Sequence, residues 1–174
     1  MAFYTIEPER RTLHGYFSRD LAPVLTIDPG DTVRFRTLDA GWGLGPFPDD
    51  GSPRQEFEPR TEDDDGHALC GPIFIRGAKP GMTLSIHIDD LQVGSYGWTG
   101  AGGWSTPLND RLKVSDLPKF GLNWTLDAQA MTALDQYGHT VSLHPFMGVL
   151  GMPLDVPGKQ PTPPPRVTGG AGAA

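Results

Sequence analysis

The chain has 174 residues, a length that fits one domain, and its 23 glycines and 18 prolines are interspersed with apolar residues. A formal net charge of −7 argues against a nucleic-acid partner, because phosphate binding needs clustered Lys and Arg. Cys70 is the single cysteine, which excludes an intramolecular disulfide and a thiolate zinc cluster. The sequence also lacks a signal-peptide core and any apolar run of the ~18 residues that a membrane span needs. We therefore expect a cytoplasmic protein without membrane contact.

Two phrases in the first half predict β-hairpins. Residues 24–27 and 32–37 alternate apolar and polar side chains on either side of a Pro-Gly turn, and residues 72–75 and 84–88 repeat this design. The alternation would place His87 on the strand face opposite its apolar neighbours, toward solvent.

Long loops and further short strands complete the pattern. Residues 43–66 and 94–110 are expected as loops, and residues 124–126, 131–134 and 140–143 as strands, with a turn at 136–138. No long amphipathic helix is predicted. The sequence therefore favours a mainly β fold, a sandwich or partly closed barrel of short antiparallel strands joined by long Gly- and Pro-rich loops.

The end of the chain differs in composition from the rest. Residues 157–174 are rich in proline and contain only Gly and Ala after Thr168. Such a segment offers little apolar surface to bury. We expect residues 1–156 to form one β domain and residues 157–174 to form a flexible tail.

The densest group of reactive side chains precedes the strand at 72–75. His67 is a candidate metal ligand or general base, with Asp65 as a co-ligand or as the group that orients the imidazole. Alternatively, the aspartates at 63–65 form a solvated loop and His67 binds a backbone group. Cys70 could be a nucleophile, or a small apolar residue beside a buried strand.

A second candidate site lies in the predicted loop at 94–110. Trp98 and Trp104 with Gly103 could form the wall of a small-molecule pocket, and Asp110 could add a catalytic carboxylate. Alternatively, the indoles anchor the loop on the core and Asp110 is a surface carboxylate.

The other histidines are weaker candidates for a functional site. His14, His139 and His144 have no acidic or thiol neighbour at a useful spacing. A cupredoxin-like copper site is disfavoured because the first histidine after Cys70 is His87, beyond a predicted strand and turn.

Several phrases, in order along the chain, resemble the acetamidase/formamidase family. They combine a His-x-x-x-Gly-Pro strand start with a Gly-Ala-x-Pro-Gly turn and with later Gly-, Trp- and Pro-rich stretches. The phrases are GHALCGPI at 66–73, RGAKPG at 76–81, GGWSTP at 102–107, PFMGV at 145–149 and PPRVTGG at 164–170.

The resemblance implies a mostly β, self-assembling enzyme that hydrolyses short linear amides such as formamide and acetamide to the carboxylate and ammonia. A divalent metal, zinc or calcium, bound by Asp65 and His67 would suit that chemistry. Family members continue beyond the Gly-Gly phrase with further acidic and histidine motifs. The alternative is therefore a truncated, inactive domain that keeps only its folding and assembly surfaces, which would be exposed and favour homo-oligomers.

Overall fold

The computed structural model describes residues 1–50, 52–162 and 170–172. These residues divide into two compact units. Unit 1 contains Met1–Leu44, Gln55–Ile88 and the described residues from Met147 onward, and unit 2 contains Gly45–Arg54 and Asp89–Phe146.

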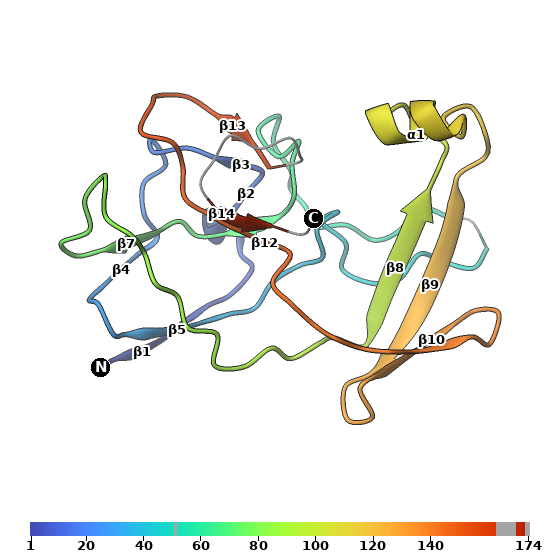
Figure 1. Cartoon of the computed structure of the whole chain (residues 1–174), viewed down its shortest axis with the longest axis horizontal. Coiled ribbons are helices and arrows are strands. Elements are labelled where there is room, and N and C mark those ends of the chain that lie inside the picture. Colours follow the sequence, from blue (N-terminus) through green and yellow to red (C-terminus); the bar gives the residue numbers. More distant parts are fainter. Residues whose placement is uncertain (51, 163–169, 173–174) are drawn as a thin grey trace. The chain divides into compact units, whose positions relative to one another are not determined.

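Unit 1 is built from two-stranded sheets whose partners lie far apart in the sequence (Figure 1). Two pairs are parallel, namely β1 (Phe3–Ile6) with β5 (Thr32–Phe35) and β4 (Leu25–Ile27) with β7 (Ile73–Ile75). Three pairs are antiparallel, namely β2 (Leu13–His14) with β6 (Leu69–Cys70), β3 (Tyr16–Phe17) with β13 (Gln160–Pro161), and β12 (Val149–Gly151) with β14 (Gly170–Gly172). A 3-10 turn, η1 (Arg10–Thr12), precedes β2.

The two predicted hairpins are wrong, although three of their four strands form. β4 and β5 do flank the expected turn, in which Asp31 N donates to Asp28 O at 3.1 Å. The N-terminal strand nevertheless binds β5, because Thr32 N donates to Ala2 O at 3.0 Å and Ala2 N donates to the Asp31 carboxylate at 2.6 Å. β4 pairs with β7 instead, so long-range contacts decided the pairing.

The fourth predicted strand, at residues 84–88, is absent. Met82 N donates to Lys79 O within the turn, but no strand of the described chain pairs with the residues that follow. Without a partner, extended backbone has no ladder to complete.

The core of unit 1 contains Ile6, Leu13, Phe17, Ile27, Leu69 and Trp42. Trp42 is only 1% exposed, and its indole Nε1 donates to Gly66 O at 2.8 Å. Because Trp42 and Gly66 lie at the two ends of the expected 43–66 loop, this hydrogen bond closes the loop onto the core.

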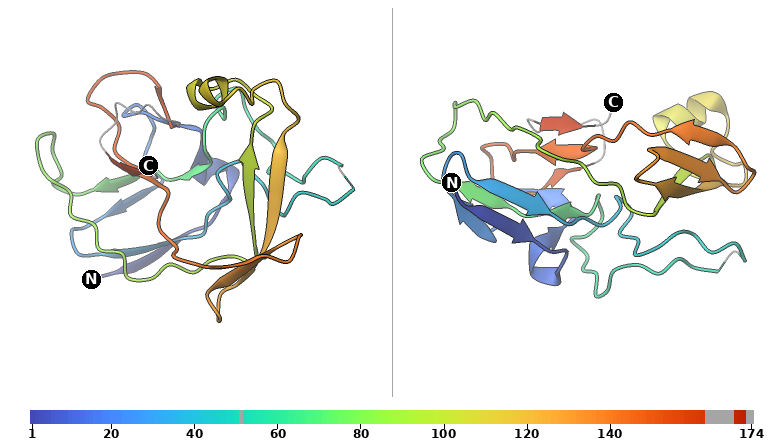
Figure 2. Two further views of the ribbon diagram at one scale, coloured as in Figure 1. Left: turned by 45° about the vertical axis from the view of Figure 1, so that its right-hand side comes forward. Right: turned by 90° about the horizontal axis from the view of Figure 1, so that it is seen from below.

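Unit 2 is an antiparallel sheet in the order β11-β10-β9-β8, with one short helix (Figures 1 and 2). The elements are β8 (Tyr96–Ala101), α1 (Pro107–Leu112), β9 (Phe120–Asp127), β10 (Thr132–Asp135) and β11 (Thr140–Ser142). The three strands predicted between 124 and 143 are therefore confirmed. The loop predicted at 94–110 is wrong for residues 96–101, which form β8 despite their glycines. This strand pairs along its whole length with β9.

Helix α1 begins where its sequence provides a cap. Thr106 Oγ1 accepts from Asn109 N at 3.0 Å, and a proline occupies the first turn, where its missing N–H costs no hydrogen bond. The helix ends at Lys113, whose backbone is left-handed with φ 57°. The mainly β fold is confirmed, and the absence of a long helix holds for the described residues.

Part of the expected tail is paired. Residues 160–161 form β13 and residues 170–172 form β14. Residues 163–169 and 173–174, and with them most of the 164–170 phrase, lie outside the described residues. The flexibility of this tail stays a prediction.

Candidate functional site

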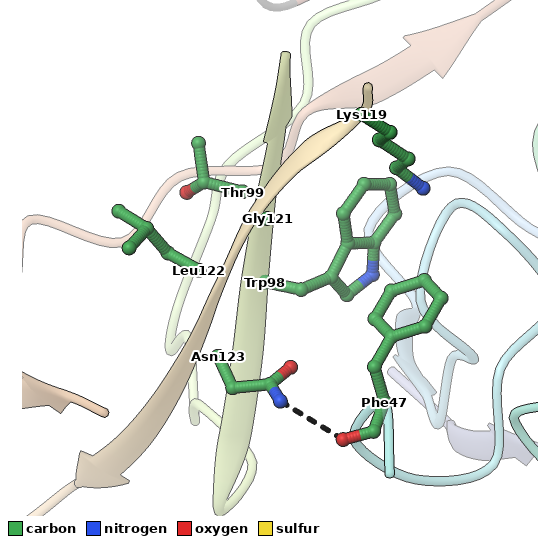
Figure 3. A pocket seen from close by; sticks show the side chains of 7 residues that line it. All are labelled: Phe47, Trp98, Thr99, Lys119, Gly121, Leu122 and Asn123. Atoms are coloured by element: carbon green, nitrogen blue, oxygen red, sulfur yellow. Dashed lines mark hydrogen bonds between the residues drawn. The ribbon is translucent and has the colours of Figure 1, made fainter. Parts of the chain in front are cut away.

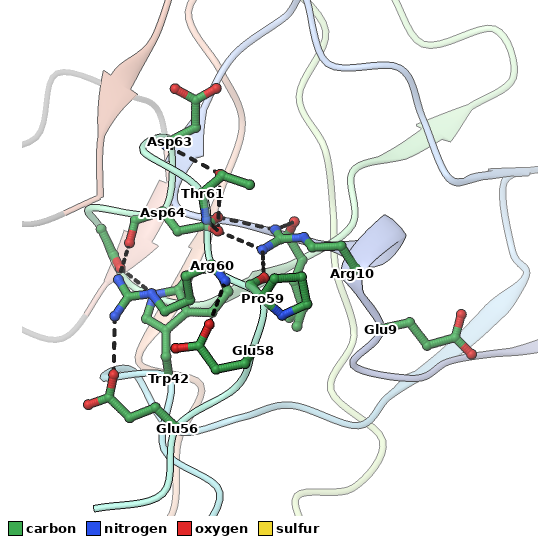
Figure 4. A network of polar contacts seen from close by, with 12 residues as sticks. Glu9, Arg10, Trp42, Glu56, Glu58, Pro59, Arg60, Thr61, Asp63 and Asp64 are labelled. Atoms are coloured by element: carbon green, nitrogen blue, oxygen red, sulfur yellow. Dashed lines mark hydrogen bonds and ion pairs between the residues drawn. The ribbon is translucent and has the colours of Figure 1, made fainter. Parts of the chain in front are cut away.

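In unit 1, the acidic run at 63–65 is organised around a buried carboxylate, Asp64 (Figure 4). Its side chain is 1% exposed and accepts two hydrogen bonds from Arg10, at 2.6 and 3.1 Å, and one from Thr61 N at 2.8 Å. Burial alone would raise the pKa of Asp64, but the hydrogen bonds from Arg10 and Thr61 and the charge of Arg10 hold this pKa below its usual value. The alternative of a wholly solvated aspartate loop is therefore wrong at Asp64.

Two arginines flank the buried indole of Trp42. The guanidinium carbons of Arg10 and Arg60 lie 5.6 and 5.0 Å from the ring centroid. Arg60 also donates to the Asp64 carbonyl and to Glu56, the latter at 3.3 Å. Because each cation has acceptor oxygens in hydrogen-bonding distance, this network is a structural brace for the loop that leads to His67.

The backbone around His67 is tightly packed. His67 N donates to Thr162 Oγ1 at 2.7 Å. A Cβ at Gly66 would lie 2.0 Å from Gly15 O, and one at Gly15 would lie 2.7 Å from Asp64 Cα, so both positions need glycine. His67 is half-buried, and its position is fixed by rigid backbone on both sides.

The predicted metal ligands do not make a complete site in the described chain. Asp65 is exposed and His67 is half-buried, and no group of three or more His, Cys, Asp or Glu side chains able to hold a metal occurs within residues 1–50, 52–162 and 170–172. Protein zinc sites use at least three protein ligands, so two residues do not fit such a centre. The assignment of Asp65 and His67 as metal ligands stays a prediction, and no reaction step is assigned to a metal.

Cys70 has the properties of a packing residue. It lies in β6, and burial raises the pKa of its thiol to about 11. Its Sγ donates to Arg36 O at 3.4 Å. A thiol with this pKa is protonated at neutral pH, which removes the thiolate that a nucleophile needs.

Two histidines do have acidic neighbours, contrary to expectation. Burial lowers the pKa of His14 to about 4, against the opposing charge of Asp64. His139 Nδ1 lies 2.9 Å from the Asp135 carboxylate across the turn that joins β10 to β11. These pairs were missed because one depends on strand pairing and the other on a turn that folds its ends together. Asp135 also accepts from the backbone N–H groups of Tyr137 and His139, which makes it a turn anchor.

Unit 2 contains a small cavity of about 190 Å³ beside β8 and β9 (Figure 3). Its lining residues are Phe47, Trp98, Thr99, Lys119, Gly121, Leu122 and Asn123. Phe47 packs edge-on against Trp98 with ring centroids 5.6 Å apart, and Asn123 Nδ2 donates to Phe47 O at 2.9 Å. These two contacts attach the 45–54 segment to the sheet and form one wall of the cavity.

The structure brings together the three predicted substrate-binding residues. Lys119 Nζ lies 5.7 Å from the Trp98 ring and 5.8 Å from the Trp104 ring. A Cβ at Gly103, where φ is +78°, would lie 2.8 Å from Lys119 N, so this glycine lets the loop approach Lys119 closely. Of the predicted site residues in this unit, Trp98 lines the cavity, whereas Gly103, Trp104 and Asp110 do not. The Asp110 carboxylate accepts from Ser105 Oγ at 3.0 and 3.2 Å and from Ser115 Oγ, so its catalytic role stays a prediction.

Comparison with known proteins places these features in a family. The family model described as Acetamidase/Formamidase family matches residues 4–154. The chain belongs to the acetamidase/formamidase family. It is similar to a Schizosaccharomyces pombe protein (strain 972) named "Putative formamidase C869.04", with 34% identity over 84 residues, which are 48% of this chain and 20% of the relative. The chain thus aligns with about a fifth of that relative's length, and no solved structure matches it.

The acetamidase/formamidase match covers the candidate residues of both units, from Asp65 and His67 to Asp110. Sequence reasoning missed Phe47, Lys119 and Asn123 in the unit 2 cavity. Phe47 lies in a loop without periodicity, and nothing local indicates that it reaches β8. Lys119 stands directly before β9, and nothing in the neighbouring sequence distinguishes it from Arg111 and Lys113. Within the described chain, no helix has the length and apolar character of a membrane span.

Proposed function

We propose that the chain hydrolyses short linear amides, formamide and acetamide among them, to the carboxylate and ammonia. The observation that carries the proposal is the match to the acetamidase/formamidase family over residues 4–154. The dimensions of the unit 2 cavity support it. An amide of three or four heavy atoms needs roughly 100 Å³, taking the ~30 Å³ share of one water as a scale, whereas the cavity holds about 190 Å³.

Amide hydrolysis needs an activated water, stabilisation of the oxyanion, and an acid to protonate the departing amine. In unit 1, His67 is our acid–base candidate, supported by its rigid backbone and partial burial. In unit 2, the cavity beside Trp98 is our candidate for binding the amide, supported by its aromatic walls and by the polar side chain of Asn123. Each assignment is tested by its own variant.

Ammonia release from formamide, acetamide and propionamide, measured beside a peptide substrate, tests the activity. We expect turnover of the small amides only. His67→Ala should lower kcat about 100-fold or more, whereas Cys70→Ser should retain most activity because the thiol is protonated. Trp98→Ala should mainly raise KM. Faster turnover of the peptide, or loss of activity with thiol-blocking reagents in a folded protein, would contradict these assignments.

The alternative, a catalytically silent domain, predicts no ammonia from any amide with folded protein. Metal analysis of the same preparation completes the comparison. Zinc or calcium in stoichiometric amount that is lost in Asp65→Ala would support the metal assignment. Activity in a metal-free protein would contradict the metal assignment.

We also propose that the chain self-associates in the cytoplasm. In unit 1, the segment at 82–88 is exposed throughout, and its apolar side chains occupy every second position, with Met82 exposed by 61%, Leu84 by 38%, Ile86 by 48% and Ile88 by 42%. An apolar row of this kind on an extended backbone is the surface that strand addition uses. A second copy of the chain is the partner we propose.

Sedimentation velocity at several concentrations tests this association. Leu84→Lys combined with Ile86→Lys should shift the protein toward the monomer. The matched control, Thr83→Lys with Ser85→Lys, adds the same charge at the alternate positions and should change the distribution less. Equal effects of the two pairs would show that charge, and not the apolar row, governs the association.

A further inference from the structure

Lys119 occupies an unusual environment in unit 2. Its ammonium nitrogen lies 4.9 Å from the ring centroid of Phe47, in addition to its contacts with Trp98 and Trp104 at 5.7 and 5.8 Å (Figure 3). Aromatic rings from three separate segments therefore lie within 6 Å of one exposed cation. Such contacts hold an ammonium by the negative faces of the rings.

Two glycines make room for this arrangement. A Cβ at Gly100 would lie 3.2 Å from Lys119 Cε and 3.6 Å from the Trp98 ring. Gly103 packs its backbone against that of Lys119, and Gly103 N donates to Val114 O at 3.0 Å. The Gly-rich stretch around Trp104 therefore positions the lysine stem between the indoles.

The charge of Lys119 is not neutralised by a carboxylate in the part of the chain that the structure describes. No ion pair within residues 1–50, 52–162 and 170–172 includes it, although the chain carries a net charge of −7. Ring faces stabilise a cation but leave its N–H donors available. Arg54 lies over two of the same rings, 4.4 Å from Phe47 and 5.6 Å from Trp98, and adds to the positive potential.

We propose that Lys119 is the anion-binding group of the unit 2 cavity and that its ligand is a short carboxylate such as formate or acetate. Phe47 and Trp98 offer an apolar surface for a methyl group, and Lys119 offers the charge (Figure 3). At about 190 Å³ the cavity has room for a short carboxylate. The choice of a carboxylate rests on the proposed function, because amide hydrolysis yields that product; the cation in its aromatic cage does not depend on it.

The consequence is that the protein retains the acid it forms. A carboxylate competes for the cavity with a neutral amide of the same size, because only the anion gains the interaction with Lys119. Formate and acetate are therefore competitive inhibitors, and acetate binds at least about tenfold more tightly than acetamide, a ratio of the size expected for one charge-assisted hydrogen bond.

Titration of the full chain, followed by the indole N–H resonances of Trp98 and Trp104, tests the inference without requiring turnover. Sodium acetate should shift both resonances saturably, and equal ionic strength of sodium chloride should not. Acetamide should need at least about a tenfold higher concentration for the same shift. Lys119→Met and Lys119→Gln should weaken acetate binding at least tenfold, Lys119→Arg should retain it, and the control Lys113→Met should leave it unchanged. Spectral dispersion reports folding of each variant.

Unchanged acetate shifts in folded Lys119→Met and Lys119→Gln would overturn the inference, as would shifts by acetate and chloride that are alike and unsaturable. Tighter binding of inorganic phosphate than of acetate would overturn the carboxylate assignment. The two proposals can fail separately. Acetate binding through Lys119 in a protein without amidase activity leaves the inference standing, whereas amidase activity without such binding removes it alone.

Discussion

Two cations in this chain lie over tryptophan rings at similar distances, Arg10 over Trp42 in unit 1 at 5.6 Å and Lys119 over Trp98 in unit 2 at 5.7 Å. Their other partners differ. Arg10 forms a two-point ion pair with the buried Asp64, whereas Lys119 has further aromatic rings and a cavity beside it. The same cation-over-ring contact therefore belongs to a brace in one unit and lies beside a cavity in the other.

The role of a cation is therefore indicated by its other partners more than by its contact with a ring. A buried carboxylate is costly to leave alone, so Asp64 requires Arg10 for stability. At an exposed site, the interaction of a lysine with ring faces contributes only about 0.5–1 kcal/mol to stability, which leaves its charge available for a ligand.

The rings themselves give the largest expected contrast. Trp42→Ala should destabilise the protein by about 3–5 kcal/mol, because it empties a core position that is 1% exposed and removes the hydrogen bond to Gly66 O. Trp98→Ala, at a half-buried cavity wall, should cost no more than about 2 kcal/mol. Urea denaturation followed by far-UV circular dichroism measures both. Equal losses of unfolding free energy in the two variants would mean that Trp98 is a core residue of unit 2, as Trp42 is of unit 1.

The cations give the next contrast. Arg10→Met should lower the free energy of unfolding by about 2–3 kcal/mol, because it leaves the Asp64 carboxylate buried without its cation. The partial exposure of Arg10 keeps this loss below that of a fully buried pair. Lys119→Met should cost less than about 1 kcal/mol. The same denaturation measurement applies, and Arg11→Met, whose guanidinium is exposed beside Glu9, serves as the control for unit 1. A Lys119→Met loss as large as that of Arg10→Met would give both cations a structural role.

The pH dependence of stability sharpens the unit 1 side of the comparison. Burial lowers the pKa of His14 to about 4, below its usual 6.5, so the folded state binds fewer protons than the unfolded state between these values. The stability is therefore fully present above pH 6.5 and falls as the pH decreases toward 4, by on the order of 1–2 kcal/mol between pH 7 and 5. Below about pH 4, protonation of Asp64 adds to the loss, because its pKa is also depressed in the folded state.

Urea midpoints at half-unit pH intervals measure this slope. His14→Gln should flatten the curve between pH 7 and 5 while leaving the steeper loss below pH 4. An unchanged slope in the folded variant would assign the titration to another group.

The sequence predicts the strands of unit 2 between 124 and 143 most accurately. Each of these strands pairs with its neighbour in the sequence. A local pattern is enough there, because turn and strand together define the hairpin. In unit 1 the same kind of pattern predicted strands correctly at 24–27 and 32–37 but failed for their pairing, since β4 and β5 each bind a strand from elsewhere in the chain.

The candidate sites show the same division. The aromatic and glycine residues Trp98, Gly103 and Trp104 were recognised from composition, and the structure gathers them around Lys119. Lys119 itself was missed, since its importance comes from rings on other segments. The burial of Asp64 was also missed, because three consecutive aspartates look alike in sequence and only the position of Arg10 singles one out.

The sequence by itself determined the mainly β character of this chain, its turns, its family and the identity of its indole- and glycine-rich stretch, because these follow from local alternation, from backbone preferences and from ordered motifs. The tertiary structure alone decided which strands pair, which aspartate is buried and which cation faces a cavity. Those outcomes depend on contacts between residues far apart along the chain, whose free energies no local pattern contains.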